Sequence, residues 1–477
     1  MAEQNMLVMK FGGTSVGTPA AMAQVVRICL DARRTWGRLV VVASALSGIT
    51  DHLIASAEQA ARGDLSVFDA TLNELNERHH AMVDELICLP QLNDQAHRQV
   101  EQLVTDFSNL CQAIHVLGEA SPRALDAVAA LGERLSVRIL AGAIASTGLP
   151  AEVVEATRLV VTDDHFQNAV PDMAATTLNT CEILEPLLVD GCIPVVTGFI
   201  GATPDGLTTT LGRGGSDYSA SILAVALGAK EVWIWTDVDG VMTADPRLVP
   251  DARTIPVLSY REVAEMAYFG AKVLHPKSIQ PAIQHGIGLR VCNTFNPAHP
   301  GTRLVSERET NGQGTIKAVA AIRGLQLVTL SGTGMLGVPG VAGRIFSAAA
   351  TTGISVPLII ESTSEQAICF PVPKERSADV IRALRTHLAD AFQRGDIECA
   401  DTSAEVDIIT VISPALRSTA GVAGRIFGAL GKAGINVLGI SFGASDVSIN
   451  LILGAQDTRR ALIELHKLTS SRKSENR

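Results

Sequence analysis

An internal repeat in the last third of this 477-residue chain limits its possible folds more than any other feature. Residues 328–356 align without gaps to residues 409–437, and the heptapeptide GVAGRIF occurs in both copies. Each copy begins with a strand-like run, passes through a turn into an amphipathic helix, and continues with two strands and a second helix. Units of this size and order are ferredoxin-like. We therefore predict two ferredoxin-like units, at 315–395 and 396–470.

The first copy also carries a pattern that is typical of a different fold. Gly332, Gly334 and Gly337 match the spacing GxGxxG, and Glu361 ends the next strand-like run, which is close to a dinucleotide-binding fingerprint. The second copy has SPALRS at the corresponding place, and one repeat is too short for a doubly wound domain. A dehydrogenase that binds NAD is therefore only a distant alternative.

The first 300 residues show a second kind of organisation, in which short apolar runs alternate with helical patterns. The strand-like runs are 6–11, 38–43, 151–155, 158–161, 193–198 and 231–235. Such alternation predicts an α/β domain with an open, largely parallel sheet and helices on both faces. We assign residues 1–300 to this domain.

The stretch TTTLGRGGSD, at 208–217, is the strongest candidate for a ligand loop in this domain. A helical pattern begins at about Ser216, and the backbone amides of a helix start attract anions. Glycine lets a ligand approach the main chain closely, and Arg213 offers a fork for a carboxylate or phosphate. The alternative is a tight turn with a surface arginine.

Several other polar residues interrupt apolar elements. Lys10 precedes a glycine loop at 12–17, and SALSGITD occupies 44–51 between a strand and a helix. Glu133 interrupts a helix rich in alanine and leucine, and Lys272 lies in a segment that otherwise has a buried pattern. Each has an ordinary alternative: a surface lysine, a helix-capping turn or a solvated helix face.

Composition excludes several classes of protein. Hydrophobic residues make up 47% and charged residues 18%, which is typical of a globular α/β protein. The net charge of -10, without a basic stripe, argues against nucleic-acid binding. The eight cysteines form no CxxC motif, so we expect neither disulfides nor a protein-ligated metal. No apolar run is long enough for a membrane span and no signal-peptide pattern is present, so we expect a cytoplasmic protein.

Seven motifs follow one another in a characteristic order: KFGGTSVG, SALSGIT, GERLS, TTTLGRGGSDY, WTDVDGV, DPR and GAKVLHP. With them the chain resembles the aspartate kinases, which belong to the amino-acid-kinase fold family. GRGGSD together with GAKVLHP is the most specific part of this resemblance. The repeats resemble the ACT regulatory domains of the same family, so the likeness covers about 6–470. In that family one ACT unit is inserted in the other, so 312–324 is expected to lend a strand to the second unit.

The resemblance implies an activity and a set of site residues. The activity is ATP-dependent phosphorylation of the β-carboxylate of aspartate, the first step toward lysine, threonine and methionine. The catalytic residues would be Lys10, Lys272 and Asp217. Aspartate would be bound by Ser44, Thr50, Glu133, Arg213, Gly214, Gly215 and Ser216. ATP would be bound by Lys10, Phe11, Gly12, Gly13, Ser15, Thr236, Asp237, Met242, Arg247, Lys272 and Val273, with Mg²⁺ held mainly by the nucleotide phosphates.

Three positions depart from the family pattern or vary within it. Met242 stands where tyrosine is usual, and Asp51 stands where some relatives have asparagine. Glu361 stands where threonine-sensitive relatives carry glutamine, which leaves the identity of an amino-acid effector open. The turn at 335–343 is the expected effector pocket, and the ACT units are expected to assemble the chain into a homodimer or larger. The alternatives are another carboxylate or phosphate kinase of this fold and a non-catalytic amino-acid sensor.

Overall fold

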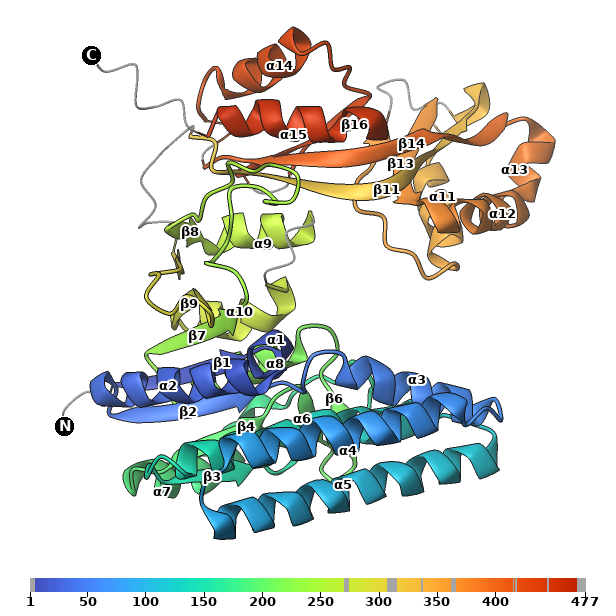
Figure 1. The fold of residues 1–477 in the computed structure, drawn as a ribbon. Helices are drawn as coiled ribbons and strands as arrows, with labels where there is room; N and C mark the ends of the chain where they lie inside the picture. The colour runs from blue at the N-terminus through green and yellow to red at the C-terminus, as the bar shows by residue number, and fades with distance from the viewer. Residues whose placement is uncertain are drawn as a thin grey trace, which may run out of the picture. The chain divides into compact units, whose positions relative to one another are not determined.

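The computed structural model describes residues 5–269, 274–306, 315–335, 338–361, 366–414, 416, 418–443 and 446–469. The chain forms two compact units (Figure 1). The first comprises Met1–Val241, Thr254–Tyr260 and Val273–Glu309, and the second comprises Met242–Arg253, Arg261–Lys272 and Thr310–Arg477. Two short segments that precede residue 300 therefore group with the C-terminal repeats.

The first unit is built on an eight-stranded sheet in the order β3-β4-β2-β1-β7-β9-β10-β8. Its strands are β1 (Met6–Phe11), β2 (Arg38–Ala43), β3 (Ala151–Val154), β4 (Ile193–Thr197), β7 (Glu231–Thr236), β8 (Val257–Ser259), β9 (Gly288–Asn293) and β10 (Thr302–Val305). All neighbouring pairs are parallel except β9 with β10. The predicted open, largely parallel sheet is thus confirmed.

Helices cover both faces of this sheet, because its central strands are apolar on both sides. Leu7, Met9 and Phe11 of β1 belong to one core cluster with the helices α2 to α6, whereas Val8 is equally buried outside that cluster. Successive side chains of a strand point to opposite faces, so Val8 faces the other helical layer. The helices are α1 (Gly13–Val16), α2 (Pro19–Thr35), α3 (Ile49–Ala61), α4 (Ser66–Leu86), α5 (Pro90–Leu117), α6 (Pro122–Ala145), α7 (Met173–Val189), α8 (Gly215–Ala226) and α10 (Pro276–Gln284).

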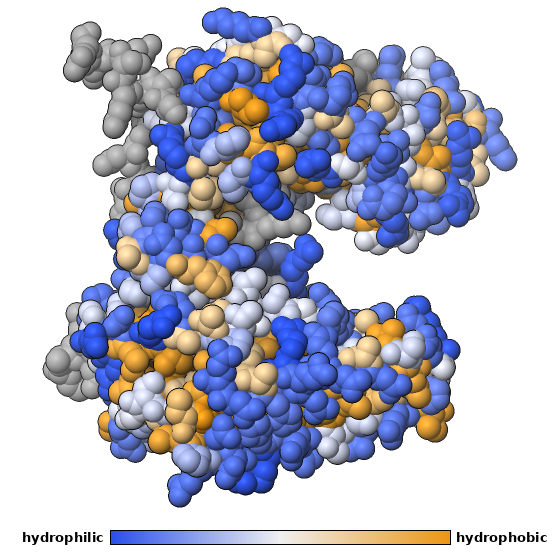
Figure 2. Space-filling model, in the orientation of Figure 1, coloured by the Kyte–Doolittle hydropathy of each residue, from blue (hydrophilic) through white to orange (hydrophobic). Residues whose placement is uncertain are grey.

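Two local features of the first unit bear on the sequence predictions. The expected strand at 158–161 is wrong: a 3₁₀ turn occupies Ala156–Arg158, and only Val161 forms an isolated bridge, to Ala202. A hairpin precedes the ligand loop, in which β5 (Ile200–Ala202) pairs antiparallel with β6 (Thr208–Thr210). Figure 2 shows that hydrophilic residues cover much of the visible surface over the long helices α4 and α5.

The second unit contains a six-stranded sheet in the order β12-β13-β11-β14-β16-β15. Its elements are α9 (Tyr260–Tyr268, from its second residue onward), β11 (Ala318–Ser331), α11 (Val341–Ala350), β12 (Ile360–Glu361), β13 (Ala367–Pro373), α12 (Ser377–His387), α13 (Ala389–Arg394), β14 (Cys399–Ile412), α14 (Val422–Lys432), β15 (Gly439–Phe442), β16 (Ser448–Gly454) and α15 (Thr458–Lys467). The central strands are shared between the repeats. Residues 318–322 pair with 408–412 of the second copy, while 328–331 pair with 399–402.

Side-chain contacts bind the two short early segments to the repeats. Thr243 Oγ1 lies 2.8 Å from His466 Nε2 of α15, and both side chains are buried. On α9, Glu262 is 2.8 Å from Lys317 Nζ, and Glu265 accepts a hydrogen bond of 2.8 Å from Ser448.

The glycines of the GxGxxG pattern have a packing role in the second unit. A Cβ on Gly332 would lie 2.3 Å from the carbonyl oxygen of Asp396, and one on Gly334 would lie 2.5 Å from the Cα of the same residue. Only glycine permits this approach of two chain segments. Gly337 lies outside the described residues. Close packing within the repeat therefore accounts for Gly332 and Gly334.

Within the described parts of the chain, no helix has both the length and the apolar character that crossing a membrane requires.

Candidate functional site

A pocket of about 540 Å³ opens in the first unit where β1 and β2 end and α8 begins. Ligands of open α/β sheets bind at the carboxyl ends of parallel strands, so this is the expected place for a site. Its lining includes ten of the residues predicted from the sequence: Lys10, Gly13, Ser44, Thr50, Glu133, Arg213, Gly214, Gly215, Ser216 and Asp217. Residues far apart in the sequence are thus brought together around one small cavity.

A buried ion pair lies at the end of β1. Lys10 Nζ is 2.6 Å from Asp217 Oδ1, and the two side chains are 12% and 11% exposed. Lys10 is the fifth residue of β1, and Asp217 lies in the first turn of α8. A partly desolvated pair fixes both side chains more firmly than a surface pair does. Asp217 therefore holds the Lys10 ammonium at the pocket wall.

The carboxyl group of Glu133 is buried against the loop that follows β2. The backbone amide of Ala45 donates to Oε1 at 3.2 Å, and Oε2 has no hydrogen-bond partner among the described residues. Helix α6 approaches this loop closely because residue 132 is glycine: a Cβ there would lie 2.7 Å from the Cβ of Ala45. Burial raises the pKa of Glu133 to about 8, although the Ala45 amide and the charge of Lys10 oppose this. The raised pKa indicates that no cation among the described residues is paired with this buried carboxyl.

The loop before α8 has the close-packed backbone that its glycines predict. Gly214 has φ 72° and caps α8, which begins at Gly215, one residue before the predicted start. A Cβ on Gly214 would meet Ser278 Oγ at 2.4 Å, so no other residue fits there. The hydroxyl of Ser44 donates to Ser216 at 3.0 Å, joining two pocket walls. Arg213 is exposed to solvent and lines the pocket, and no ion pair of its side chain is seen within the described residues.

Two pocket residues that sequence reasoning missed have strained backbones. Phe199 and Gln167 are the non-glycine residues with positive φ in the described chain, at 68° and 69°, and both line the pocket. Each amide is held by a buried side chain: Phe199 donates to Ser219 Oγ and Gln167 donates to Asp126 Oδ2, both at 2.9 Å. Strained residues of this kind concentrate at functional sites.

Asp126 also lines the pocket and orders a second part of it. It is 1% exposed and accepts hydrogen bonds from both the amide and the hydroxyl of Thr210, at 2.9 and 2.8 Å. Burial raises the pKa of Asp126, against the opposing effect of these bonds. No local pattern in the sequence marks Asp126 as a site residue, because its partners lie 41 and 84 residues away along the chain.

The glycine loop after β1 forms the short helix α1 beside the pocket. The amide of Gly12 donates to the carbonyl of Trp235 at 3.3 Å, and a Cβ on Gly12 would lie 3.5 Å from Lys10 Nζ. Glycine at this position thus places no side chain beside the ammonium, which suits a phosphate group there. Ser15 is fully buried, with its hydroxyl 2.7 Å from that of Thr294.

The remaining predicted nucleotide residues that the structure describes do not line this pocket. Phe11 is buried and stacks on Trp235, with ring centroids 5.8 Å apart. Thr236 and Asp237 follow at the end of β7, where the Thr236 hydroxyl donates to the Asp237 carboxylate at 3.0 Å. Met242 and Arg247 belong to the second unit, and Arg247 forms an exposed ion pair with Asp245 at 2.7 Å. Lys272 and Val273 lie outside the described residues.

A second cavity, of about 320 Å³, lies at the turn before α11, where the sequence predicts an effector pocket. Its walls are mainly apolar, and Glu361 is the one charged residue among the described residues that line it. The described residues that line it are Met335, Val338, Pro339, Gly340, Val341, Ala342, Glu361 and Ile368. Across the described chain, no group of three or more His, Cys, Asp or Glu side chains is arranged to hold a metal.

Comparison with known proteins was made by sequence and by fold. A profile of the Amino acid kinase family matches residues 5–293, and an ACT domain profile matches 328–388 and 409–468. The bifunctional aspartokinase/homoserine dehydrogenase 1 of Zea mays is 36% identical over 467 residues, which is 96% of this chain and 50% of that protein. The chain thus spans about half the length of the bifunctional relatives. The chloroplastic aspartokinase 1 of Arabidopsis thaliana is 32% identical over 464 residues, which is 79% of its length.

Solved structures agree with these matches. E. coli aspartokinase III, in complex with aspartate and ADP (R-state), superposes with a TM-score of 0.80 at 30% identity, covering 97% of this chain and 99% of that one. The same enzyme with lysine and aspartate (T-state) gives a TM-score of 0.77 at 31% identity, with the same coverage. The chain therefore belongs to the amino acid kinase family and, within it, to the aspartokinases with tandem ACT domains.

Proposed function

We propose that this chain transfers the γ-phosphoryl group of ATP to the β-carboxylate of L-aspartate, forming 4-phospho-L-aspartate and ADP. This is the first step toward lysine, threonine and methionine. One observation carries the proposal: the cations of Lys10 and Arg213 and the buried carboxyl of Glu133 line the same pocket of about 540 Å³. The aspartate and ADP bound to the related E. coli enzyme support the choice of ligands.

These three ionisable groups suit an amino acid that carries a second carboxylate. Glu133 has a buried oxygen without a partner among the described residues, and the α-ammonium of the amino acid would donate a hydrogen bond to that oxygen. The exposed guanidinium of Arg213 would pair with the α-carboxylate through two parallel hydrogen bonds. With both backbone groups of the amino acid fixed, its β-carboxylate would be directed toward Lys10.

The transfer itself needs positive charge and orientation more than proton transfer. A β-carboxylate, with a reference pKa of about 4, is already ionised at pH 7 and needs no general base. One of its oxygens bonds to the γ-phosphorus while the bond from that phosphorus to the bridging oxygen of ADP breaks. Lys10, held by Asp217, would neutralise the charge that develops on the phosphoryl oxygens. Lys272 is proposed as the second cation.

The phosphates of ATP would lie beside Lys10, where Gly12 places no side chain next to the ammonium. Mg²⁺ arriving with the nucleotide would neutralise phosphate charge, and we propose that the phosphates supply most of its ligands. For the base and ribose we propose Thr236, Asp237, Met242, Arg247 and Val273. We also propose that the protein is cytoplasmic, as expected from the sequence.

The function is tested by measuring ADP release with aspartate, glutamate and acetylglutamate in parallel. We expect turnover with aspartate and background rates with the other two. Turnover with glutamate or acetylglutamate in place of aspartate would assign the chain to another carboxylate kinase of this fold. Aspartate binding without turnover would make it an amino-acid sensor.

The buried state of Glu133 predicts how aspartate binding depends on pH. Its pKa is raised to about 8 in the ligand-free protein, so near pH 6 the carboxyl must lose a proton before it can pair with an ammonium. The KM for aspartate should therefore fall as pH rises from about 6 to about 8, by up to about tenfold per pH unit, and then level off. Glu133→Gln should show a higher KM without this slope. A KM that is flat across this range in the unmodified protein would contradict the assignment, and the KM for ATP serves as control.

We further propose that an amino acid regulates the chain through the cavity before α11. The Glu361 carboxylate would pair with an ammonium, while the first amides of α11 would face a carboxylate. Lysine bound to the related E. coli enzyme supports an amino-acid effector. A homodimer or larger assembly through the ACT units belongs to the same proposal.

Regulation is tested by adding lysine, threonine and methionine, singly and in pairs, to the aspartate assay. At least one of them should change the rate, and Glu361→Gln should raise the concentration needed by about tenfold, the usual effect of losing one charged hydrogen bond. If no amino acid changes the rate, the repeats serve assembly alone.

A further inference from the structure

Helix α4 contacts two loops that border the candidate active site, although none of its residues lines the pocket. From α4, Arg78 Nη2 donates to the carbonyl oxygen of Gly17 at 3.4 Å and to that of Ser47 at 3.2 Å. Gly17 ends the glycine loop that follows β1, and Ser47 lines the pocket in the loop between β2 and α3. One guanidinium group thus contacts both loops.

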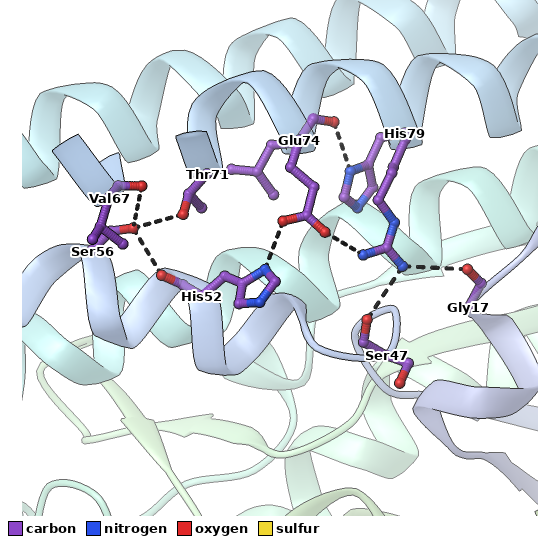
Figure 3. Close-up of polar contacts among 10 residues, drawn as sticks. Gly17, Ser47, His52, Ser56, Val67, Thr71, Glu74 and His79 are labelled. Atoms are coloured by element: carbon purple, nitrogen blue, oxygen red, sulfur yellow. Dashed lines mark hydrogen bonds and ion pairs between the residues drawn. The ribbon is translucent and has the colours of Figure 1, made fainter. Parts of the chain in front are cut away.

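The guanidinium is itself held in place by a polar network, shown in Figure 3. Arg78 Nη1 lies 2.6 Å from Glu74 Oε1, and the other oxygen of Glu74 lies 2.6 Å from Nδ1 of His52 on α3. Burial alone would raise the pKa of Glu74, but hydrogen bonds and charge from Arg78 and His52 hold it below its usual range. A buried hydrogen bond of 2.9 Å between Ser56 and Thr71 joins the same two helices. The position of Arg78 is therefore fixed from α3 as well as from α4.

The two loops that Arg78 contacts are packed backbone to backbone. The amide of Ser47 donates to the carbonyl of Gly13 at 3.2 Å. A Cβ on Gly17 would lie 2.8 Å from the same carbonyl and 3.4 Å from the Cβ of Ser47, so only glycine fits. Arg78 adds a second link between the loops, because it donates to the carbonyl groups of both Gly17 and Ser47. A shift of either loop would break the bridge.

We propose that Arg78, oriented by Glu74, is a positioning residue that sets the phosphate-binding loop against the carboxylate-binding loop. This inference rests on the proposed function, in which the first loop holds ATP and the second holds aspartate. Each loop keeps its own ligand groups without Arg78, so each substrate should still bind. The distance between the reacting atoms depends on the register of the two loops, and an error of about 1 Å can cost about a hundredfold in rate.

The test compares Arg78→Ala and Arg78→Lys with the unmodified protein in the aspartate assay. Arg78→Ala should lower kcat by about tenfold or more, while the KM values for aspartate and ATP each change less than about threefold. Arg78→Lys keeps a charge near Glu74, but a single ammonium lacks the planar fork, so its kcat should also fall. Arg98→Ala is the matched control, because Arg98 is exposed on the neighbouring helix α5.

The outcomes separate this inference from the proposed function. If the unmodified protein phosphorylates no aspartate, the proposed function fails, and with it this inference. If it does so and both Arg78 variants keep its kcat, the positioning role alone is wrong. The role is also wrong if a lower melting temperature and a smaller fraction of folded protein account for the loss of kcat. It is wrong, too, if the variants change only the KM for a single substrate. A lowered kcat in both variants, with unchanged melting, supports it.

Discussion

Replacement of Lys10 by alanine is expected to lower kcat by about 100- to 1,000-fold, as losing one preorganised group that stabilises transition-state charge typically does. The reason is geometric: Lys10 Nζ lies at the pocket wall, 2.6 Å from Asp217, beside the space left by Gly12. Steady-state kinetics with saturating aspartate and ATP measure the effect. A kcat close to that of the unmodified protein would remove Lys10 from the mechanism.

The Lys10 variant needs controls, because it also leaves the buried carboxylate of Asp217 unpaired and so destabilises the fold. Lys10→Ala combined with Asp217→Asn removes that charge and should recover stability without recovering kcat. Lys230→Ala is a matched surface control, since Lys230 is exposed before β7. Thermal unfolding of all four proteins separates loss of folding from loss of chemistry.

Replacement of Arg213 by alanine is expected to raise the KM for aspartate by about 10- to 100-fold, which corresponds to losing a charge-assisted pair of hydrogen bonds. The KM for ATP should change less than about threefold, because the phosphates are assigned to the loop after β1. The KM of Arg213→Lys for aspartate should lie between those of the unmodified protein and Arg213→Ala, since lysine keeps the charge but loses the bidentate fork. Initial rates with each substrate varied in turn give both constants.

The opposite pattern would show that the loop before α8 faces the other ligand. If the KM for ATP rises and that for aspartate does not, Arg213 binds phosphate and the two loops exchange roles. Arg123→Ala provides the control, because Arg123 is an exposed arginine at the start of α6.

Local patterns were sufficient to predict most elements of the first unit. Short apolar runs located β1 and β2 at the bounds that the structure has. The predicted strand at 158–161 fails because a local turn bond and burial, in place of strand pairing, fix its apolar residues. The amide of Val160 bonds to the carbonyl of Ala156, and Leu159 and Val160 are fully buried. A short apolar run has no period long enough to distinguish a strand from a buried turn.

Other features depend on contacts that no local pattern contains. The grouping of Met242–Arg253 and Arg261–Lys272 with the repeats rests on pairs such as Thr243 with His466. These partners lie 223 residues apart in the chain. The shared strands β11 and β14 were anticipated only through the family resemblance.

The candidate site likewise contains some residues that the sequence marks and others that only the structure reveals. Arg213 stands out in the sequence because it lies in a glycine-rich loop, and Lys10 stands out because it closely precedes one. Phe199 and Gln167 do not, since a positive φ in a non-glycine residue is imposed by distant partners. Asp126 resembles any acidic residue on a helix until the structure places it against Thr210.

The most direct test of the account is the identity of the phosphorylated product. The protein is incubated with Mg²⁺, ATP and hydroxylamine, which converts an acyl phosphate to a hydroxamate, and with aspartate, glutamate or acetylglutamate in separate reactions. The account predicts hydroxamate with aspartate alone, in equal amount to the ADP released. ADP without hydroxamate, or hydroxamate formed from another carboxylate instead of aspartate, would contradict it.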